Sequence, residues 1–218
     1  MTTSLVSIKG QRTSNNQDVL VQVLNNNAML YMLVDGSSSR AQSGELAQLL
    51  ASIIKQGFEA LIPEQLDFPN IKISMVNLLK SAQQQARTLY PAAVVSFNAV
   101  VVIDSIALSL YLGDCLLATV NRWNKIYWKT QPHCVQNNQK ISQLALLPER
   151  NLLTRSFKAR RFDVPQFQVI ALKQAQKLLL ASDGFWADLS PSQQAEFIKT
   201  KHLHEAPSDD TSFILIGR

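Results

Sequence analysis

The chain has 218 residues, of which 46% are hydrophobic and 17% charged, and its formal net charge is +5. This length and apolar content predict one globular domain over residues 1–218 with a sizeable core, and they exclude an intrinsically disordered chain. The positive charge favours phosphorylated or otherwise acidic partners, but an ordinary basic surface is the alternative, because the chain contains no long Lys/Arg block.

Three short β-prone segments open the chain: SLVSI at 4–8, DVLVQVL at 18–24 and AMLYMLV at 28–34. Polar turns separate them, and NNNA at 25–28 is suited to a hairpin connection. We therefore predict antiparallel strands in the first part of the chain. The third segment ends in a carboxylate, Asp35, which is followed by a glycine and three serines.

Two amphipathic helices are predicted next, because apolar residues recur at helical spacing on either side of a proline-containing loop. In this loop, PEQLDFPN at 63–70, the prolines interrupt the helical pattern and Asn70 marks a helix cap. The apolar positions are Leu46, Leu49, Leu50, Ile53 and Ile54 in the first helix and Ile71, Met75, Leu78, Leu79 and Ala82 in the second.

Strands dominate the rest of the chain. Four β-prone segments lie at 97–103, 106–113, 116–121 and 125–130. The polar segment 131–149 is predicted to be a surface loop or flap. Three further strands and one Ser/Pro-capped helix follow, at 166–172, 177–182, 211–217 and 190–200 respectively. Because no alternating βαβ repeat is present, this order of elements predicts an α+β fold.

Four aspartates lie next to apolar strands: Asp18, Asp35, Asp183 and Asp209. A carboxylate at a buried strand end is costly unless it is paired or bound to a cation. Carboxylate oxygens and water are the ligands that Mg²⁺ and Mn²⁺ prefer. A single Asp-Gly is more often a plain turn, but several such strand ends brought together would form a site for a hard cation.

The motifs and their order resemble those of the metal-dependent protein phosphatases, the PPM family of 2C-type Ser/Thr phosphatases. The similar segments are RTSNNQD, LVDG followed by SGELA, YLGDC, ERNLLTRSF, LLLASDGFWADLS and DDTSFILI, and together they span nearly the whole chain. The resemblance implies a bacterial-type phosphoserine/phosphothreonine protein phosphatase that depends on Mn²⁺ or Mg²⁺. It also implies a four-layer α-β-β-α sandwich of two central antiparallel sheets with a two-metal site at one edge.

The resemblance further implies roles for individual residues. Asp35 is similar to the aspartate that bridges the two metal ions, and Gly36 to the glycine that binds metal through its carbonyl. Asp183 and Asp209 resemble the ligands of the first metal. Asp18 resembles the last residue of the family's Asn-Glu-Asp motif, which holds metal-bound waters, and a glutamine precedes it where glutamate is common.

Two more residues match functional positions of the family. Asp114 matches the aspartate that helps to bind a third, weaker metal in bacterial members, and Arg12 matches the arginine that binds substrate phosphate. In such a site two divalent ions lower the pKa of a bridging water, so that hydroxide can attack phosphorus at neutral pH. The guanidinium of Arg12 can hold two phosphate oxygens. The expected catalytic residues are therefore Arg12 and Asp35.

Ser37, Ser38 and Ser39 depart from the family pattern, because many bacterial members have Met-Gly-Gly after Asp-Gly. We interpret the serines as a reshaped rim and not as a nucleophile, since the chain has no G-x-S-x-G turn at this point. The departure supports a second hypothesis, a non-catalytic pseudophosphatase that binds a phosphorylated or regulatory partner. The retained aspartates oppose it, because without metal their mutual repulsion costs stability.

His133 is interpreted as a structural or rim residue, and His202 and His204 are expected to be exposed. A basic stretch around ERNLLTRSFKARR is interpreted as a solvated face, with docking of a phosphoprotein or acidic partner as the alternative. Its members are Arg150, Arg155, Lys158, Arg160 and Arg161.

Cys115 and Cys134 form no CxxC pair, so we predict neither a disulfide framework nor a zinc site. The N-terminal segment has no apolar stretch behind a basic start, and the longest apolar-rich stretch is interrupted by aspartates. We therefore expect a cytoplasmic protein without a membrane span. Nucleic-acid binding is not expected, because basic and aromatic residues are not interleaved. The expected partners of this monomer are a phosphorylated Ser/Thr protein and, from the resemblance, a cognate Ser/Thr kinase.

Overall fold

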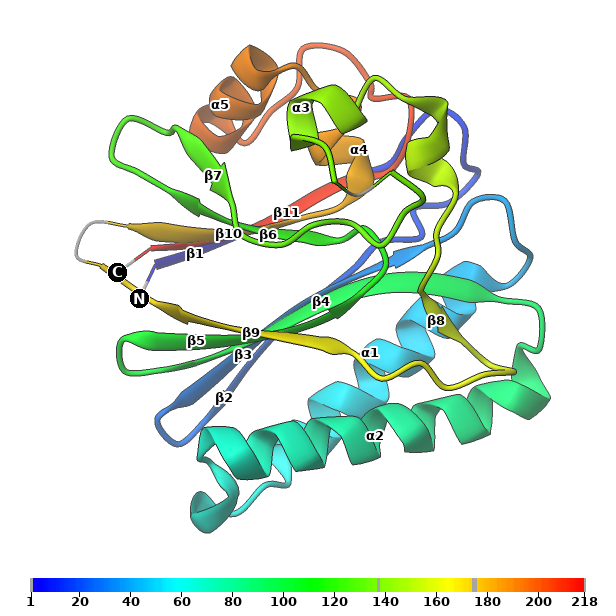
Figure 1. Cartoon of the computed structure of the whole chain (residues 1–218), viewed down its shortest axis with the longest axis vertical. Coiled ribbons are helices and arrows are strands. Elements are labelled where there is room, and N and C mark those ends of the chain that lie inside the picture. The colour runs from blue at the N-terminus through cyan, green and yellow to red at the C-terminus, as the bar shows by residue number, and fades with distance from the viewer. Residues whose placement is uncertain (1, 137, 174–175, 218) are drawn as a thin grey trace.

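Two antiparallel β-sheets lie face to face at the centre of the computed structural model, which describes residues 2–136, 138–173 and 176–217 (Figure 1). The first sheet has the order β1-β11-β10-β6-β7, with bounds Thr2–Ile8, Thr211–Gly217, Lys177–Ala181, Leu116–Val120 and Ile126–Trp128. The second has the order β2-β3-β4-β5-β9, with bounds Val19–Asn25, Ala28–Gly36, Val94–Ile103, Ile106–Leu112 and Gln166–Ala171. A short strand, β8 (Phe157–Lys158), pairs with the start of β4.

Helices cover the outer faces of both sheets (Figure 1). On the second sheet lie α1 (Ser43–Glu59) and α2 (Phe68–Leu89), and on the first lie α3 (Ile141–Leu144), α4 (Asp183–Trp186) and α5 (Pro191–Thr200). Two 3₁₀ turns, Pro63–Gln65 and Pro148–Asn151, lie in the connections. This arrangement confirms the predicted α+β class and the four-layer α-β-β-α sandwich. In the part of the chain that the structure describes, no helix combines the length and apolarity needed to cross a bilayer.

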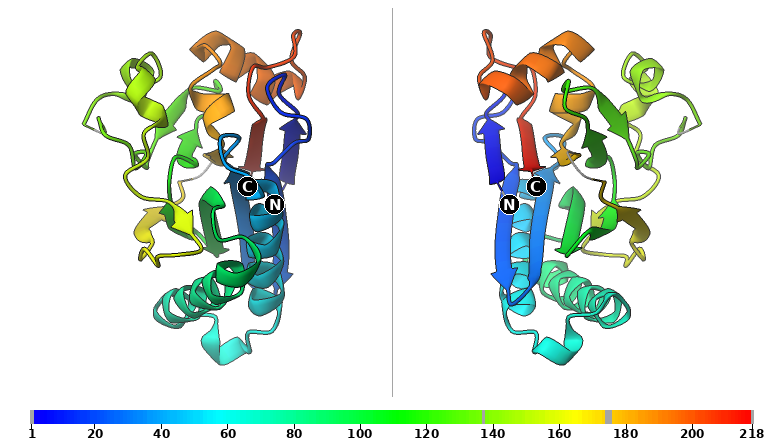
Figure 2. Two further views of the ribbon diagram at one scale, coloured as in Figure 1. Left: turned by 90° about the vertical axis from the view of Figure 1, so that its right-hand side faces the viewer. Right: turned by 90° about the vertical axis from the view of Figure 1, so that its left-hand side faces the viewer.

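The first and last strands pair along their whole length, so that the two ends of the described chain lie side by side (Figure 2). The register pairs Thr2 with Gly217 and Ile8 with Thr211. The loop that follows β1 therefore runs beside the segment that precedes β11, and the backbone N–H of Arg12 donates to the carbonyl of Ser208 at 3.2 Å. This pairing brings two distant parts of the sequence to one edge of the sandwich.

The apolar run of β3 is continuous because the strand is buried on both faces. Leu30, Met32 and Val34 pack in the core between the second sheet and its helices, whereas Tyr31 and Leu33 pack between the two sheets. Successive side chains of a strand point to opposite faces, so a central strand needs apolar residues at every position. The strand can thus deliver a terminal carboxylate to the edge of a dry core.

The predicted strands and helices are present, with differences of a few residues at their ends. The prediction that Asn70 caps the second helix was wrong. The N-cap of α2 is Asp67, whose carboxylate accepts a hydrogen bond from the backbone N–H of Asn70 at 2.8 Å. An aspartate with extended backbone satisfies a free N–H of the first turn, which places the start of the helix before Asn70.

The prediction of an irregular surface loop at 131–149 was only partly right; residue 137 lies outside the described residues. The segment contains α3, and Ile141 and Leu144 of this helix are buried against the first sheet. One helical turn is too short to give a periodic pattern in the sequence, and the same holds for the short elements α4 and β8.

Phe213 of β11 lies in an aromatic cluster between the first sheet and α5. Its ring centroid is 5.5 Å from that of Phe185 and 4.9 Å from that of Phe197. We expect Phe213→Ala to lower the free energy of unfolding by about 3–5 kcal/mol, because it leaves a cavity in the core. Urea denaturation would measure this. Leu24→Ala is the control: Leu24 is 66% exposed, so its loss should change stability by about 0.5 kcal/mol or less. Equal effects of the two substitutions would contradict this description of the core.

Candidate active site

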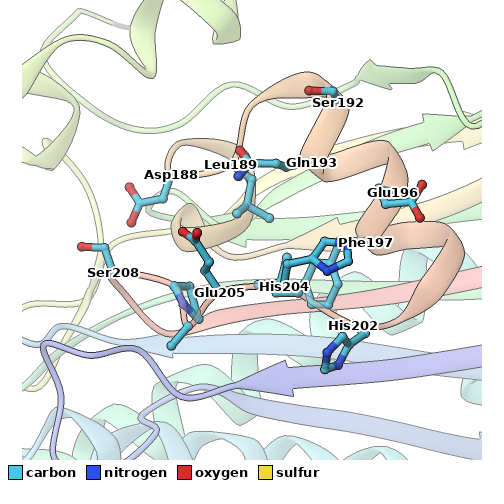
Figure 3. Close-up of a pocket in the computed structure, with 13 residues that line it drawn as sticks. Asp188, Leu189, Ser192, Gln193, Glu196, Phe197, His202, His204, Glu205 and Ser208 are labelled. Atoms are coloured by element: carbon cyan, nitrogen blue, oxygen red, sulfur yellow. The ribbon is translucent and has the colours of Figure 1, made fainter.

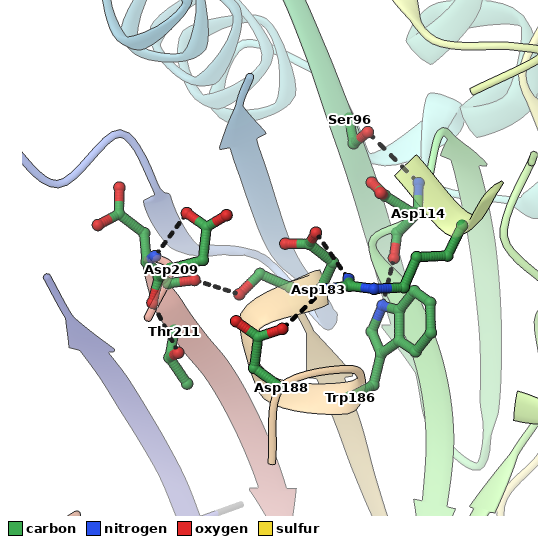
Figure 4. Close-up of polar contacts among 10 residues, drawn as sticks. Ser96, Asp114, Asp183, Trp186, Asp188, Asp209 and Thr211 are labelled. Atoms are coloured by element: carbon green, nitrogen blue, oxygen red, sulfur yellow. Dashed lines mark hydrogen bonds and ion pairs between the residues drawn. The ribbon is translucent and has the colours of Figure 1, made fainter. Parts of the chain in front are cut away.

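A cavity of about 220 Å³ opens at one edge of the sandwich and is lined by acidic side chains. Its lining residues are Arg12, Asp35, Gly36, Ser37, Ser38, Ser39, Val94, Ser96, Asp114, Arg150, Asn151, Leu153, Asp183 and Asp209. The structure thus gathers all the site residues predicted from the sequence except Asp18, whose carboxylate lies behind the wall. Figure 4 shows Asp114, Asp183 and Asp209 where the strand ends meet.

Five separate segments supply these side chains. Asp35 is the second-last residue of β3, Asp114 lies between β5 and β6, and Asp183 begins α4 two residues after the last residue of β10. Asp209 precedes β11, and Arg12 lies in the loop between β1 and β2. Strands of both sheets end or begin at this edge, so residues that are far apart in the sequence lie close together in the fold.

Gly36 allows the end of β3 to pass close to the loop before β2. Its N–H donates to the carbonyl of Gln17 at 3.3 Å. A Cβ at this position would lie 3.0 Å from the Cβ of Gln17 and 3.0 Å from the backbone of Ser43. A larger residue would therefore push apart the segments that carry Asp18 and Asp35.

Asp18 is withdrawn from water without a compensating contact. Both carboxylate oxygens are buried and lack a hydrogen-bond partner among the described residues. Burial is the main cause that raises the pKa of Asp18 to about 7, and the charges of Asp210 and Asp209 raise it further. The hydroxyls of Ser182 and Ser212 offset this only in part, because they donate to other oxygens.

The carboxylates of the cavity wall repel one another. Burial, followed by the charges of Asp18, Asp183 and Asp114, raises the pKa of Asp35 well above its ordinary value. Burial and the charges of Asp114 and Asp209 do the same to the pKa of Asp183. Because desolvation and like charges act in the same direction, the ionised cluster is unstable without a cation.

The chemistry of this donor set fits divalent hard cations. All the candidate donors are oxygens, and the orphaned carboxylate of Asp18 is the kind of buried charge that a cation or its water shell satisfies. Within the described chain, no three His, Cys, Asp or Glu side chains are already arranged to hold one ion.

Arg150 reaches into the carboxylate cluster, which the sequence did not predict. Its guanidinium donates to Asp183 at 3.4 Å and to Asp188 at 2.7 Å. The interpretation of the basic stretch as one solvated or docking face is therefore wrong for its first member, although Arg161 near the other end is 82% exposed and pairs with Asp163. Arg150 lies within the ERNLLTRSF motif, and this membership is the only sequence signal that could have identified it.

Asp210 is a second residue that sequence analysis missed. Its carboxylate accepts hydrogen bonds from the N–H of Gly10 at 2.7 Å, the hydroxyl of Thr13 at 2.7 Å and the N–H of Gln17 at 2.8 Å. These bonds tie the loop that carries Arg12 to the start of β11. Of two adjacent aspartates, Asp209 thus lines the cavity and Asp210 holds the loop.

The backbone around Asp114 is held by neutral groups. The N–H of Gly113 donates to Nδ1 of His133 at 3.0 Å, and the indole N–H of Trp186 donates to the carbonyl of Asp114 at 2.8 Å. His133 is buried and stacks on Tyr111, with 5.0 Å between ring centroids. Burial lowers the pKa of His133, which favours the neutral ring that this acceptor role requires. These contacts support its interpretation as a structural residue.

The three serines form a turn at the rim of the cavity. The N–H of Ser37 donates to the carbonyl of Val94 at 3.1 Å, and the hydroxyls of Ser37 and Ser39 lie 3.0 Å apart. In the described chain these two hydroxyls hydrogen-bond to each other, and no histidine bonds to either of them. The geometry is that of a polar rim and offers no base for a serine nucleophile.

Comparison with known proteins gives a consistent result along the chain. The family model described as protein phosphatase 2C matches residues 9–211. Among characterised proteins, the protein phosphatase PhpP of Streptococcus pneumoniae is 25% identical over 211 residues, which cover 91% of this chain and 84% of that protein.

Solved structures with the same fold come from several bacteria. The serine/threonine phosphatase of S. agalactiae superposes with a TM-score of 0.85 at 19% identity, covering 99% of this chain and 98% of that one. The serine/threonine phosphatase Stp1 of Staphylococcus aureus gives a TM-score of 0.85 at 18% identity, covering 99% and 94%. At these identities the structural likeness establishes the fold alone.

The contacts of Asp210 predict a specific loss of order. Asp210→Ala should lower the free energy of unfolding by about 2–4 kcal/mol, because three donors lose a charged acceptor. Amide hydrogen exchange at Gly10 and Gln17 should accelerate. Asp210→Asn keeps one acceptor oxygen and should have a smaller effect. Unchanged exchange at both amides in Asp210→Ala would contradict the proposed tether.

The raised pKa of Asp18 predicts how stability depends on pH. A carboxyl group whose pKa is higher in the folded state stabilises the fold at low pH, and this contribution is lost as pH rises from about 4 through about 7. In EDTA, wild type should therefore lose about 2–4 kcal/mol relative to Asp18→Asn between about pH 4 and about pH 8.

Urea denaturation of both proteins in EDTA and in Mn²⁺ would test this dependence. Mn²⁺ should restore the stability of wild type at about pH 8, because it binds the ionised folded state. If the free energy of unfolding of wild type and of Asp18→Asn changed in parallel with pH in EDTA, the pKa of Asp18 would not be raised in the folded state.

Proposed function

The chain belongs to the protein phosphatase 2C family of Ser/Thr protein phosphatases, and from this premise we propose that it removes phosphate from phosphoserine and phosphothreonine with two bound Mn²⁺ or Mg²⁺ ions. One observation carries the proposal: mutually repelling buried carboxylates share a cavity with an arginine that has no carboxylate partner among the described residues, Arg12. Such a cavity can hold cations and a phosphate group together.

The carboxylates and Gly36 are the groups that would hold the metal ions. Asp35 would bridge them and the Gly36 carbonyl would bind one, while Asp183 and Asp209 would ligate the first. Asp18 would act through water, which agrees with its place behind the cavity wall. Asp114 would contribute to a third, weaker site. When bound, divalent ions supply a water acidic enough to act as nucleophile at neutral pH.

Arg12 would bind and orient the phosphate. The residue is exposed, lines the cavity and is anchored through its backbone to Ser208. A guanidinium can donate two parallel hydrogen bonds to phosphate oxygens, which fixes the direction of attack and offsets negative charge. Ser38 and Ser39 of the rim are exposed, so a phosphorylated side chain on a protein can approach the cavity from this side.

The alternative is a pseudophosphatase that binds phosphorylated partners without hydrolysis, and the changed rim at Ser37–Ser39 is the feature that favours it. A binding module has no need for four partly buried carboxylates near one another, because their repulsion costs stability. We therefore prefer the enzyme. In either case the proposed setting is cytoplasmic and monomeric, with a Ser/Thr kinase as the source of the phosphate and without a nucleic-acid or membrane partner.

Hydrolysis of p-nitrophenyl phosphate and of a phosphothreonine peptide in Mn²⁺ would test the proposal. Asp35→Asn and Asp183→Asn should each lower kcat/KM about 100-fold or more for both substrates, because they remove metal-binding oxygens. Arg12→Ala should weaken activity mainly through a higher KM. Glu59→Gln, an exposed change at the end of α1, is the matched control and should have no effect. If wild type were no faster than Asp35→Asn in either metal, the binding-module alternative would hold.

A further inference from the structure

A second cavity, of about 520 Å³, is larger than that of the candidate active site, and Figure 3 shows its lining. We call it the α5 cavity. Its walls are the turn after α4, one face of α5 and the segment 202–208. Its lining residues are Asp188, Leu189, Ser192, Gln193, Glu196, Phe197, His202, Leu203, His204, Glu205, Ala206, Pro207 and Ser208.

The α5 cavity combines an apolar floor with an acidic wall. Leu189, Phe197 and Pro207 are buried beneath it. Three carboxylates line it and no lysine or arginine does, although the chain has 21 basic and 16 acidic residues. Glu196 and Glu205 form no ion pair with any described residue. The cavity is therefore complementary to a cationic group with an apolar stem.

Asp188 supplies an independent sign that a donor is missing. Its Oδ1 accepts from Arg150 at 2.7 Å, but its Oδ2 is shielded from solvent and has no hydrogen-bond partner among the described residues. A buried carboxylate oxygen without a donor is unfavourable. Asp188 lines the α5 cavity, and a hydrogen-bond donor, unlike an apolar or anionic group, is the kind of ligand that this oxygen calls for.

The α5 cavity adjoins the carboxylate cluster closely enough for one peptide to occupy both. Arg150 bridges Asp188 of one cavity and Asp183 of the other. Ser208, which lines the α5 cavity, directly precedes Asp209, which lines the carboxylate cavity. An extended peptide advances about 3.3 Å per residue, so a side chain two or three residues from the phosphorylated one can enter the α5 cavity.

We infer that the α5 cavity binds an arginine side chain of the phosphoprotein substrate, two or three residues from the phosphorylated residue; this rests on the proposed phosphatase function. Arginine fits better than lysine for two reasons. Its planar guanidinium can donate to two carboxylates at once, and it stacks on aromatic rings. The imidazoles of His202 and His204 provide such faces, with ring centroids 6.5 Å apart.

Phosphothreonine peptides that differ only at one flanking position provide the test. The series places arginine or its uncharged isostere citrulline at the second or third residue on either side of phosphothreonine. We expect kcat/KM to be about five- to tenfold higher for arginine than for citrulline at one or more of these positions. In the double variant Glu196→Gln/Glu205→Gln this preference should fall to about twofold or less.

Two controls separate the α5 cavity from catalysis and from general charge. Hydrolysis of p-nitrophenyl phosphate, which has no flanking residue, should be unchanged in the double variant. Glu59→Gln removes an exposed carboxylate at the far end of α1 and should keep the arginine preference. A preference that survives in the double variant would overturn the inference.

The outcomes also distinguish this inference from the function on which it rests. Hydrolysis of p-nitrophenyl phosphate with equal rates for arginine and citrulline peptides would refute the α5 cavity assignment and leave the phosphatase intact. Absence of any hydrolysis would refute the phosphatase. Fluorescence anisotropy of labelled peptides would then decide the assignment: tighter binding of arginine peptides, lost in the double variant, supports it, and equal binding overturns it.

Discussion

The repulsion among buried carboxylates is the constraint on which the rest of this structure depends. Asp35 and Asp183 are only partly exposed, and burial together with the charges of neighbouring aspartates raises the pKa of each. The apolar sheets create the low dielectric that strengthens this repulsion and would equally strengthen the attraction to a divalent cation. Arg150 brings only one positive charge and shares it with Asp188 outside the cluster. The described basic residues therefore leave the cluster with an excess of negative charge.

The surrounding structure positions the cluster mainly through backbone groups. Among the described contacts, only Arg150 and the N–H of Asp210 bond to its carboxylate oxygens, at Asp183 and Asp209 respectively. Asp114 is held by its own N–H and carbonyl, which bond to Ser96 and Trp186. His133 fixes the preceding residue, and Asp210 fixes the loop of Arg12. If these anchors bonded to the acidic side chains themselves, they would compete with cations for the same lone pairs. Anchoring by backbone groups therefore gives rigidity without loss of ligand capacity.

The sequence predicted the elements that are governed by local pattern. Strands and long helices follow from apolar periodicity, and Asp35 was recognisable because it ends a continuous apolar strand. Asp210 was not, because its partners lie 193 to 200 residues away and nothing local separates it from Asp209. Arg150 pairs across 33 and 38 residues and was therefore grouped with its exposed neighbours. The helix cap is a different case, because Asp67 accepts from the N–H of Asn70 only three residues later, so the signal for this cap is local.

Selectivity among phosphorylated substrates has to arise outside the carboxylate cluster, because every such substrate presents the same phosphate group to it. The serine turn contributes small hydroxyls that already bond to each other, so it discriminates little. The α5 cavity differs, since Arg150 connects it to the cluster and lies nearer to Asp188 than to Asp183. Asp188 also keeps a second carboxylate oxygen without a hydrogen-bond partner among the described residues. The proposed phosphate site and the proposed substrate-binding cavity therefore share one arginine, so a change in the position of Arg150 would affect both.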